Sequence, residues 1–353
     1  MKKVISGIQQ IGIGTPHEEK AFKWYRKHFG MDICVFQDVA DASLMTGYTG
    51  NKLHSRSATL AMNIQGGGGL EIWQFTSRKT TPPAFDIQLG DLGILGIRMK
   101  SKNLLETYKK YKSEGHIDIV NGIVQAPNSS SHFFVNDLHG LIFQMVDGEE
   151  WFSNGNYHSG GIAGCMIGVS DIEQSLILYK DILEYDKIEY DETGVFDDFK
   201  GLPGGLQKMR RVLLSHSTPR KGSFSELLGF SKIELVQSLE RKPRKIFRNR
   251  FWGDLGFIHL CFDIKGMDYL KKECREKGFH FTVDSQNSFD MGNAAGRFGY
   301  IESPDGTLIE FVETHKIPIW EKIGWYLNVK DKHPEKPIPK WMLQFLRFSR
   351  VRN

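Results

Sequence analysis

The sequence predicts an α+β protein built from four βαβββ modules. Two ten-residue segments, GDLGILGIRM at 90–99 and GDLGFIHLCF at 253–262, are near copies of each other. A pattern of strand, turn and helix occurs four times, and each occurrence is followed by short strand candidates that end in an alternating strand. Recurrence in this fixed order indicates a duplicated unit.

Modules 1 and 3 begin at residues 8–31 and 162–185. In module 1, Thr15 before Pro16 predicts a helix start, because the hydroxyl caps the first turn and proline suits the first helical position. In module 3, Ser170 and Glu173 have the spacing of a capping box, which makes Ser170 the expected N-cap. Apolar residues at helical spacing follow both starts.

Modules 2 and 4 begin at residues 92–115 and 255–278 with the same plan. The predicted closing strands of the four modules are 68–75, 140–147, 231–238 and 306–313. The segments SPDG and NDLHG precede two of these strands and are typical of turns. Four glycines at 66–69 predict a hairpin turn, since no helix start follows them.

Composition describes a globular chain of 353 residues with 40% hydrophobic and 25% charged residues. A net charge of +4 supports no nucleic-acid partner. No stretch approaches the roughly 20 apolar residues that span a bilayer, and the N-terminus lacks a signal-peptide pattern. Four cysteines without CxxC spacing indicate neither a zinc knuckle nor a disulfide framework. We expect a cytoplasmic protein with a small-molecule substrate, as a monomer or a homodimer.

The segments SPDGTLIEFVE at 303–313 and SDIEQSLILYKDIL at 170–183 resemble the vicinal oxygen chelate superfamily. That group includes glyoxalase I, methylmalonyl-CoA epimerase, extradiol dioxygenases and bleomycin-resistance proteins. The resemblance covers about residues 5–315 and implies two incomplete, cupped eight-stranded barrels. It divides the chain into domain 1 (1–150, modules 1 and 2), domain 2 (158–315, modules 3 and 4) and a basic aromatic tail (316–353).

In this superfamily, metal ligands come from the first and last strands of each module. The corresponding pairs, module by module, are Gln10 and Glu71, Gly96 and Gln144, Gly164 and Glu234, and His259 and Glu310. Their separations of 61, 48, 70 and 51 residues alternate between long and short. This alternation implies that a unit of two modules was duplicated.

Similarity to dimeric glyoxalase I implies that module 1 faces module 4 and that module 2 faces module 3. The first pairing collects Gln10, Glu71, His259 and Glu310, a set similar to the ligands of animal-type glyoxalase I. The second pairing collects residues that cannot hold a metal tightly, because glycine offers no donor. We expect one metal per chain, and an empty cleft around Gly96 and Gly164. If modules 3 and 4 instead share a barrel, the ligand set becomes Glu234, His259 and Glu310. A lone strand glutamate is usually exposed, and Glu234 also fits that interpretation.

One imidazole and up to three oxygen ligands suit Zn, Ni, Mn, Co or Fe(II), with positions left for substrate oxygens. A substrate with vicinal oxygens would chelate such an ion, which stabilises an enolate as a Lewis acid. A ligand glutamate takes the proton from the adjacent carbon. The resemblance makes Glu310 the first candidate base and Glu71 the second. The chain is interpreted as a metal-dependent isomerase or lyase of glyoxalase type.

Two alternatives are an extradiol dioxygenase and a small-molecule-binding protein without catalysis. The dioxygenase needs two histidines and a carboxylate, whereas His259 is the single histidine at a ligand position. Glutathione adducts are unexpected substrates, since Gly14, Phe75 and Leu255 replace the glutathione-binding side chains of glyoxalase I. Trp73, on the same face as Glu71, favours a more apolar substrate.

The tail carries Trp341, Leu343, Phe345, Leu346 and Phe348, together with Arg347, Arg350 and Arg352, after three prolines. Such a segment could contact an anionic membrane surface. We prefer the interpretation that it packs on the body of the chain or on a partner subunit.

Overall fold

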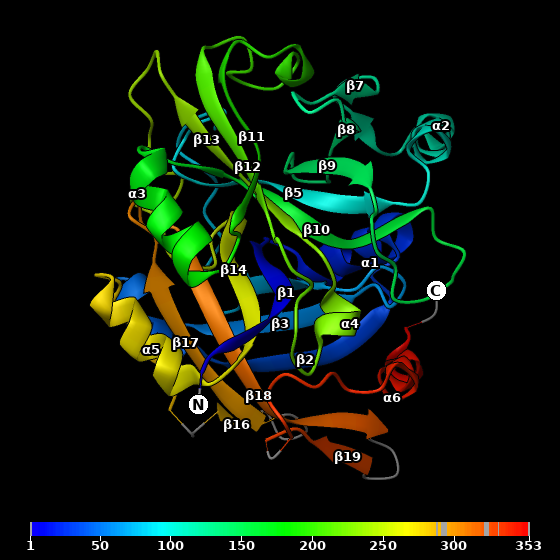
Figure 1. Ribbon diagram of the computed structural model, residues 1–353, viewed down its shortest axis with the longest axis vertical. Helices are drawn as coiled ribbons and strands as arrows, with labels where there is room; N and C mark the ends of the chain where they lie inside the picture. The colour runs from blue at the N-terminus through cyan, green and yellow to red at the C-terminus, as the bar shows by residue number, and fades with distance from the viewer. Residues whose placement is uncertain (1, 287–288, 291–294, 321–324, 331, 352–353) are drawn as a thin grey trace.

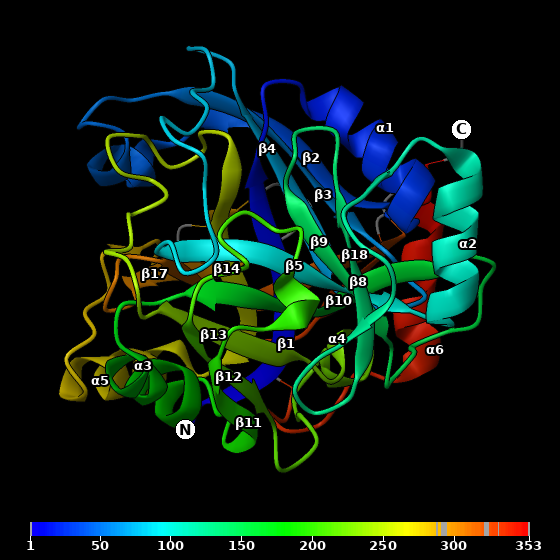
Figure 2. The same cartoon turned by 90° about the horizontal axis from the view of Figure 1, so that it is seen from above.

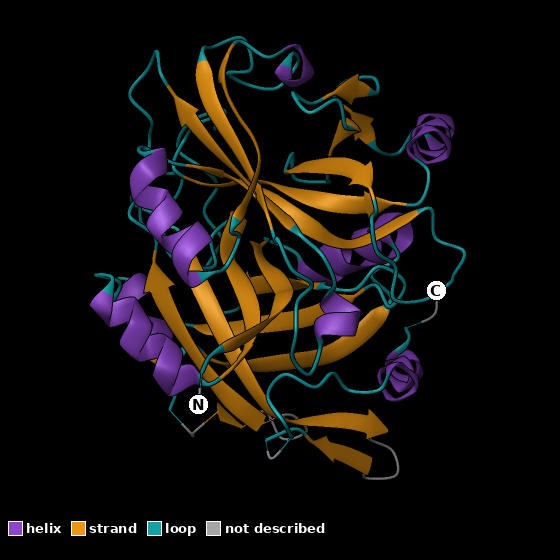
Figure 3. Ribbon diagram, in the orientation of Figure 1, coloured by secondary structure: helices purple, strands orange, loops and turns teal. Residues whose placement is uncertain are grey.

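Two curled sheets form the protein, one above the other in Figure 1. The structure is a computed structural model that describes residues 2–286, 289–290, 295–320, 325–330 and 332–351. The four predicted modules are all present, and their strands greatly outnumber their helices in Figure 3. The prediction of an α+β fold with two cupped, incomplete barrels is therefore confirmed.

Modules 1 and 2 occupy the first half of the chain. The elements of module 1 are β1 (Val4–Gly14), α1 (Glu18–Phe29), β2 (Ile33–Asp41), β3 (Ser55–Met62) and β4 (Gly69–Phe75). Those of module 2 are β5 (Gly93–Ser101), α2 (Leu104–Glu114), β6 (Asp118–Ile119), β7 (Val124–Gln125), β8 (Ser131–Asn136) and β9 (Ile142–Asp147). Gly66, Gly67 and Gly68 lie in the connection between β3 and β4, and Gly69 begins β4, in agreement with the predicted hairpin turn.

Modules 3 and 4 repeat the plan. The elements of module 3 are β10 (Ser159–Gly168), α3 (Ile172–Leu176, extended by a π-helical turn to Ile182), β11 (Lys187–Gly194), β12 (Met209–Ser215), α4 (Ser225–Leu228) and β13 (Lys232–Ser238). Those of module 4 are β14 (Gly256–Lys265), α5 (Met267–Glu276), β15 (Val283–Asp284), β16 (Phe289–Asp290), β17 (Ala295–Glu302) and β18 (Leu308–Trp320). The chain ends with β19 (Trp325–Asn328), α6 (Lys340–Leu343) and a 3-10 helix (Gln344–Ser349).

Both helix starts lie slightly later than the sequence suggests. Helix α1 begins at Glu18, and the Thr15 hydroxyl accepts a hydrogen bond from the amide of His17 instead of capping a helix that starts at Pro16. Helix α3 is capped by Asp171, whose carboxylate accepts from the amide of Gln174. Ser170 is drawn away because its hydroxyl donates to Asp305 in module 4. A contact distant in sequence thus displaces the local cap.

Each sheet combines one module from each half of the chain. In the first sheet eight strands follow one another in the order β15-β17-β18-β14-β1-β4-β3-β2, which joins modules 1 and 4. In the second the order is β11-β12-β13-β10-β5-β9-β8-β6, which joins modules 3 and 2. The first strands of the paired modules run antiparallel, β1 beside β14 and β5 beside β10. The division of the chain into linear domains 1–150 and 158–315 remains a prediction.

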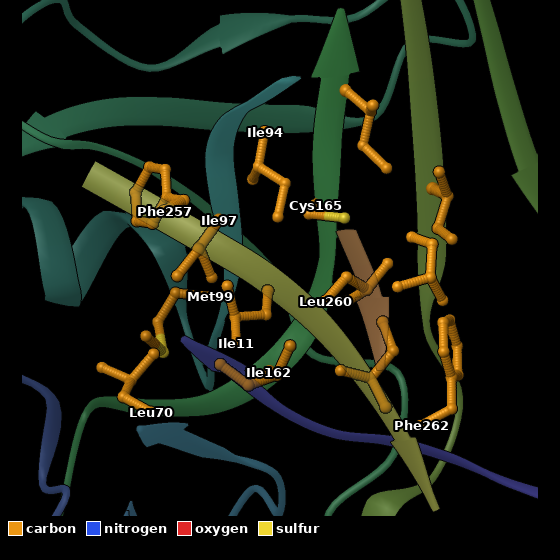
Figure 4. Close-up of a cluster of buried hydrophobic side chains, with 14 of the residues drawn as sticks. Ile11, Leu70, Ile94, Ile97, Met99, Ile162, Cys165, Phe257, Leu260 and Phe262 are labelled. Carbon is orange, nitrogen blue, oxygen red and sulfur yellow. The ribbon is translucent and has the colours of Figure 1, made fainter. Parts of the chain in front are cut away.

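The main core lies between the two sheets, where alternate residues of the central strands meet. Figure 4 shows this layer, in which side chains from β1, β4, β5, β10 and β14 converge. Figure 2 shows the central strands of the two sheets crossing in projection. Because successive strand residues point to opposite faces, the remaining side chains of these strands project into the concave side of each sheet. The candidate site lies on one of these concave faces.

The tail packs on the body of the chain. Ile338, Leu343 and Leu346 are buried in a cluster with α4, which agrees with the preferred interpretation. Strand β18 runs to Trp320, so the sheet extends past residue 316, where the tail was expected to begin. Among the residues described here, no helix is both long and apolar enough to cross a membrane.

The intertwined pairing predicts how the chain responds to being cut. A fragment ending at Asn154 would contain β1 and β5 without β14 and β10, their central partners. We expect the fragment 1–154 alone to show no cooperative unfolding as a monomer, because it exposes two central strand edges. Co-expressed with 155–353, it should copurify in equal amounts and regain one cooperative transition. Circular dichroism and analytical ultracentrifugation measure both properties. A monomeric 1–154 fragment with a sharp transition would contradict the pairing.

Candidate metal centre

Four polar side chains from four neighbouring strands project into the concave face of the first sheet. Gln10 lies on β1, Glu71 on β4, His259 on β14 and Glu310 on β18. The residues that flank them along the strands are buried in the main core: Ile11, Leu70, Ile72, Leu260, Ile309 and Phe311. Packing of these neighbours fixes the strand register, so the four polar side chains must project from the opposite, concave face of the sheet, which we call the first cup.

The imidazole of His259 lies at the centre of this group. Its Nε2 atom is 3.1 Å from Oε2 of Glu71 and 3.2 Å from Oε2 of Glu310. The amide Nε2 of Gln10 donates to Oε2 of Glu71 at 3.3 Å. One ligand atom from each of Glu71, His259 and Glu310 lies within 4.8 Å of the others. The structure therefore brings together all four residues that the sequence analysis singled out.

Burial leaves these polar atoms without ordinary partners. His259 is fully buried and Glu310 is 7% exposed. Both ring nitrogens of His259 and Oε2 of Glu310 are buried without a hydrogen bond among the residues described. Unpaired buried polar groups are costly, and two carboxylates facing one imidazole form a donor set with excess negative charge. A divalent cation would satisfy these atoms, and Gln10 could add its amide oxygen by rotation of the amide group.

The acid–base properties of the group reflect its burial. Burial raises the pKa of Glu310 to about 7, where the nearby Glu71 carboxylate adds to the rise and His259 opposes it. Burial alone would lower the pKa of His259, but the carboxylates of Glu310 and Glu71 outweigh it and raise this pKa. Burial and the mutual proximity of these groups therefore determine both pKa shifts.

Aromatic rings surround the imidazole and line a cavity of about 420 Å³. Trp252 is stacked parallel to His259 at 6.2 Å between ring centroids, and Tyr300 meets it edge-on at 5.7 Å. Gln10, Glu71 and Glu310 all line this cavity, so the cluster is accessible to a small molecule. The cavity has the size of typical ligand sites.

Two of the positions where we expected no glutathione-binding side chain, Gly14 and Phe75, are closely packed. A side chain at Gly14 would place its Cβ 2.0 Å from the carbonyl oxygen of Asp254. Phe75 is 2% exposed and packs edge-on against Trp73 at 4.6 Å between ring centroids. Close packing therefore excludes polar, peptide-binding side chains at Gly14 and Phe75.

The concave face of the second sheet holds a guanidinium where the first sheet has the imidazole cluster. Arg98, on β5 two residues after Gly96, donates through Nη1 to Oε1 of Gln144 at 2.8 Å and to Oε2 of Glu234 at 3.2 Å. By strand pairing, Gln144 corresponds to Glu310 and Glu234 to Glu71. The Arg98 side chain thus lies between the two residues that correspond to the carboxylates of the first sheet.

A second arginine completes the charge balance of this network. Arg211 donates through Nε to Glu234 at 2.7 Å and through Nη1 to Asp198 at 2.7 Å. Tyr190 also donates to Glu234, at 2.6 Å. Glu234 is fully buried; burial opposes its ionisation, but Arg211 and Arg98 outweigh burial and lower its pKa. Glu234 is therefore an ionised buried carboxylate and not an exposed one.

Two expectations are corrected by this network. We expected an empty cleft around Gly96 and Gly164, but Met166 and Ile142 pack against Gly96, and Arg98 lies between Gln144 and Glu234. Gly164 cannot be replaced by a ligand residue, since its Cβ would lie 1.7 Å from the carbonyl oxygen of Lys232. The alternative ligand set with Glu234 is wrong for this fold, because Glu234 lies in the other sheet and binds arginines.

Comparison with solved structures identifies the architecture. Glyoxalase I from Zea mays superimposes with a TM-score of 0.51 at 12% sequence identity, over 88% of this chain and 92% of that chain. A candidate dioxygenase from Bacillus subtilis superimposes with a TM-score of 0.54 at 14% identity, over 89% and 86%. The chain has the vicinal oxygen chelate fold. No protein-family model and no curated protein matches the chain by sequence.

Within the vicinal oxygen chelate fold of this chain, sequence reasoning missed Arg98, Arg211 and Trp252. Arg98 stands in a strand whose nine residues are all buried, and a lone arginine in such a run was the available signal. Trp252 precedes β14 in a loop, where nothing in the sequence marks its stacking on His259. These residues are placed by contacts between modules.

Equivalent substitutions on the concave faces of the two sheets (the first and second cups) should change stability by different amounts. In metal-free protein, we expect Glu234→Gln to lower the free energy of unfolding by about 3–5 kcal/mol, because it removes the carboxylate partner of the buried Arg98 and one of the two carboxylates that pair with Arg211. The equivalent Glu71→Gln should change it by less than about 1 kcal/mol, because it removes one of two crowded carboxylates. Urea unfolding of both variants measures the difference. Equal losses would contradict the assignment of the two cups.

Proposed function

We propose that this chain is a divalent-metal-dependent isomerase or lyase that transfers a proton on a small substrate with vicinal oxygens. The observation that supports the proposal is the convergence of ligand atoms of His259, Glu71 and Glu310 to within 4.8 Å of one another beside a cavity, with His259 and Glu310 buried. The neighbours of the same fold include glyoxalase I and a candidate dioxygenase, so the fold accommodates this class of chemistry.

His259, Glu71 and Glu310 would hold the ion, with Gln10 as a fourth ligand. A divalent ion bound there supplies Lewis-acid stabilisation for negative charge that develops on a substrate oxygen. The ligand atoms are one nitrogen and up to three oxygens, which suits Zn, Ni, Mn, Co or Fe(II). The side-chain set does not select among these ions.

Glu310 is the proposed base, and Glu71 is the second candidate. The Glu310 carboxylate, which lines the cavity, would accept the proton from the carbon next to the substrate carbonyl. The electron pair of that C–H bond forms the C=C bond of the enolate while the π pair of the carbonyl moves to oxygen, and the same carboxylate would return the proton to the former carbonyl carbon. Stacking of Trp252 on His259 and the edge of Tyr300 hold the imidazole in place and exclude water.

Ring cleavage with dioxygen is less well supported by this ligand set. It requires a second imidazole at the metal. At the position equivalent to His259 in module 1, this chain has Gln10, whose side chain supplies an amide. Proton transfer requires no additional ligand.

Proton exchange on an α-hydroxy ketone tests the proposal. We expect protein loaded with zinc or manganese to catalyse deuterium incorporation at the CH₂ carbon of 2-hydroxyacetophenone in D₂O, followed by NMR. Glu310→Gln should lower the rate at least 100-fold, because it removes the base. Glu234→Gln, in the other cup, serves as the control and should retain exchange wherever the variant remains folded.

The same assay separates the alternatives. Oxygen consumption with a catechol and Fe(II) that disappears in His259→Ala would establish a dioxygenase instead. Metal binding without exchange or oxygen uptake would indicate a binding protein. We expect no useful turnover of the hemithioacetal of methylglyoxal and glutathione.

A further inference from the structure

The C-terminal segment 338–349 closes one end of the cavity. Hydrogen bonds hold both ends of the segment. The amide of Ile338 donates to the carbonyl oxygen of Ser223 at 2.9 Å, and the amide of Val351, just after the segment, donates to the carbonyl oxygen of Asp32 at 2.8 Å. Nε of Arg350 is 3.0 Å from the Asp32 carboxylate. Between these anchors, α6 lies beside α4 (Figure 1), and the following 3-10 helix lies against β2 and β18. The segment is therefore held against the first sheet.

The inward face of this segment is apolar and reaches the cavity. Leu343 and Leu346 are buried against Phe224, Leu227 and Leu228 of the α4 region. Leu346, together with these three residues, lines the same cavity as Glu71 and Glu310. Trp341 and Phe348 point outward and are 60% and 58% exposed. Leu346 therefore faces the cavity, whereas Trp341 and Phe348 face solvent.

The cavity runs along β3 from the metal centre to this segment. Leu60 is paired with Glu71, and Met62 stands two residues further along the strand, roughly 7 Å away. Both line the cavity, and Met62 belongs to the cluster that contains Leu346. A molecule that places two oxygens at the metal centre therefore directs the rest of its body toward Leu346 and α4.

The charges along the cavity disfavour anionic substrates. Among the described residues that line it, the cationic side chain is Arg56, and Nη1 of Arg56 is paired with Asp38 at 2.9 Å. Asp41 adds a further carboxylate to the lining, whereas the charges of Glu71 and Glu310 would be balanced by the bound divalent ion. A phosphate, a sulfonate or a coenzyme A chain would meet repulsion and no free cation.

We propose that Leu346, with α4, forms a specificity wall that selects substrates carrying an uncharged apolar group opposite their vicinal oxygens. The inference rests on the proposed function for the position of the oxygens. The wall combines the C-terminal segment with α4 of module 3. Because α4 connects β12 and β13, two strands of the second sheet, module 3 contributes to the site on the first sheet. The substrate class is an aromatic-sized, neutral vicinal-dioxygen compound with a compact hydrocarbon substituent.

Calorimetric titration of zinc-loaded protein tests the wall with two chelating probes, catechol and 4-tert-butylcatechol. We expect the tert-butyl compound to bind at least tenfold more tightly than catechol, since its substituent is buried against Leu346 and α4. Leu346→Trp should reduce this ratio to about one while leaving catechol affinity unchanged. Arg347→Trp, at the neighbouring exposed position, is the matched control and should keep the tenfold ratio.

A smaller substitution at Leu346 controls for misfolding of Leu346→Trp. Leu346→Ala should lower the ratio about threefold or more, because contacts are lost without a steric clash. An unchanged ratio in both Leu346 variants, or a ratio near one in the native chain, would overturn the proposal. A sulfonated catechol that binds more tightly than catechol would also overturn it.

A probe that does not chelate separates this inference from the metal proposal. We expect 4-tert-butylphenol to bind the metal-free protein and to lose at least tenfold in affinity in Leu346→Trp. If catechol fails to bind while this result holds, the metal proposal fails and the wall stands. If 4-tert-butylphenol does not bind, or binds the variant equally well, the wall is refuted.

Discussion

The antiparallel pairing of first strands from different halves of the chain is the constraint on which the structure depends. Because β1 lies beside β14, Gly12 pairs with His259 and Gln10 with Cys261. The equivalent pairing of β5 with β10 places Gly164 opposite Arg98. The closing strand of each module runs parallel to its first strand and flanks the central pair. In the first sheet these strands add Glu71 and Glu310, and in the second sheet they add Glu234 and Gln144. The positions of Gln10, Glu71, His259 and Glu310, and of their counterparts in the second sheet, follow from this arrangement and from the alternation of strand side chains.

The two cups show two solutions to the same electrostatic problem. Each must accommodate buried polar side chains at equivalent positions. In the second cup, the cations are side chains of the protein: Arg98 and Arg211 neutralise Glu234 and Asp198. The first cup has an imidazole and two carboxylates with unpaired atoms, which fits a cation from solution. The aromatic cavity opens on the first cup, so the cavity and the cluster of candidate metal ligands lie side by side there.

The sequence predicted the modules and the four cluster residues because equivalent positions can be counted from repeated helices and closing strands. It did not predict the filling of the second cup, because Arg98 stands two residues from the expected ligand position and acts across modules. The displaced cap at Ser170 has the same origin, a bond to Asp305. Leu346 was identified in the tail, but its contact with the cavity depends on how residues 338–349 pack. Local patterns determine elements, whereas contacts between distant modules determine what each cup contains.

Anomalous diffraction from crystals of the protein grown with Mn²⁺ tests the central claim most directly. The account predicts one strong peak about 2.0–2.3 Å from Nε2 of His259 and the carboxylate oxygens of Glu71 and Glu310. It predicts no peak between Gln144 and Glu234, where Arg98 lies. A cluster without a peak at saturating metal, or a peak in the second cup, would contradict it.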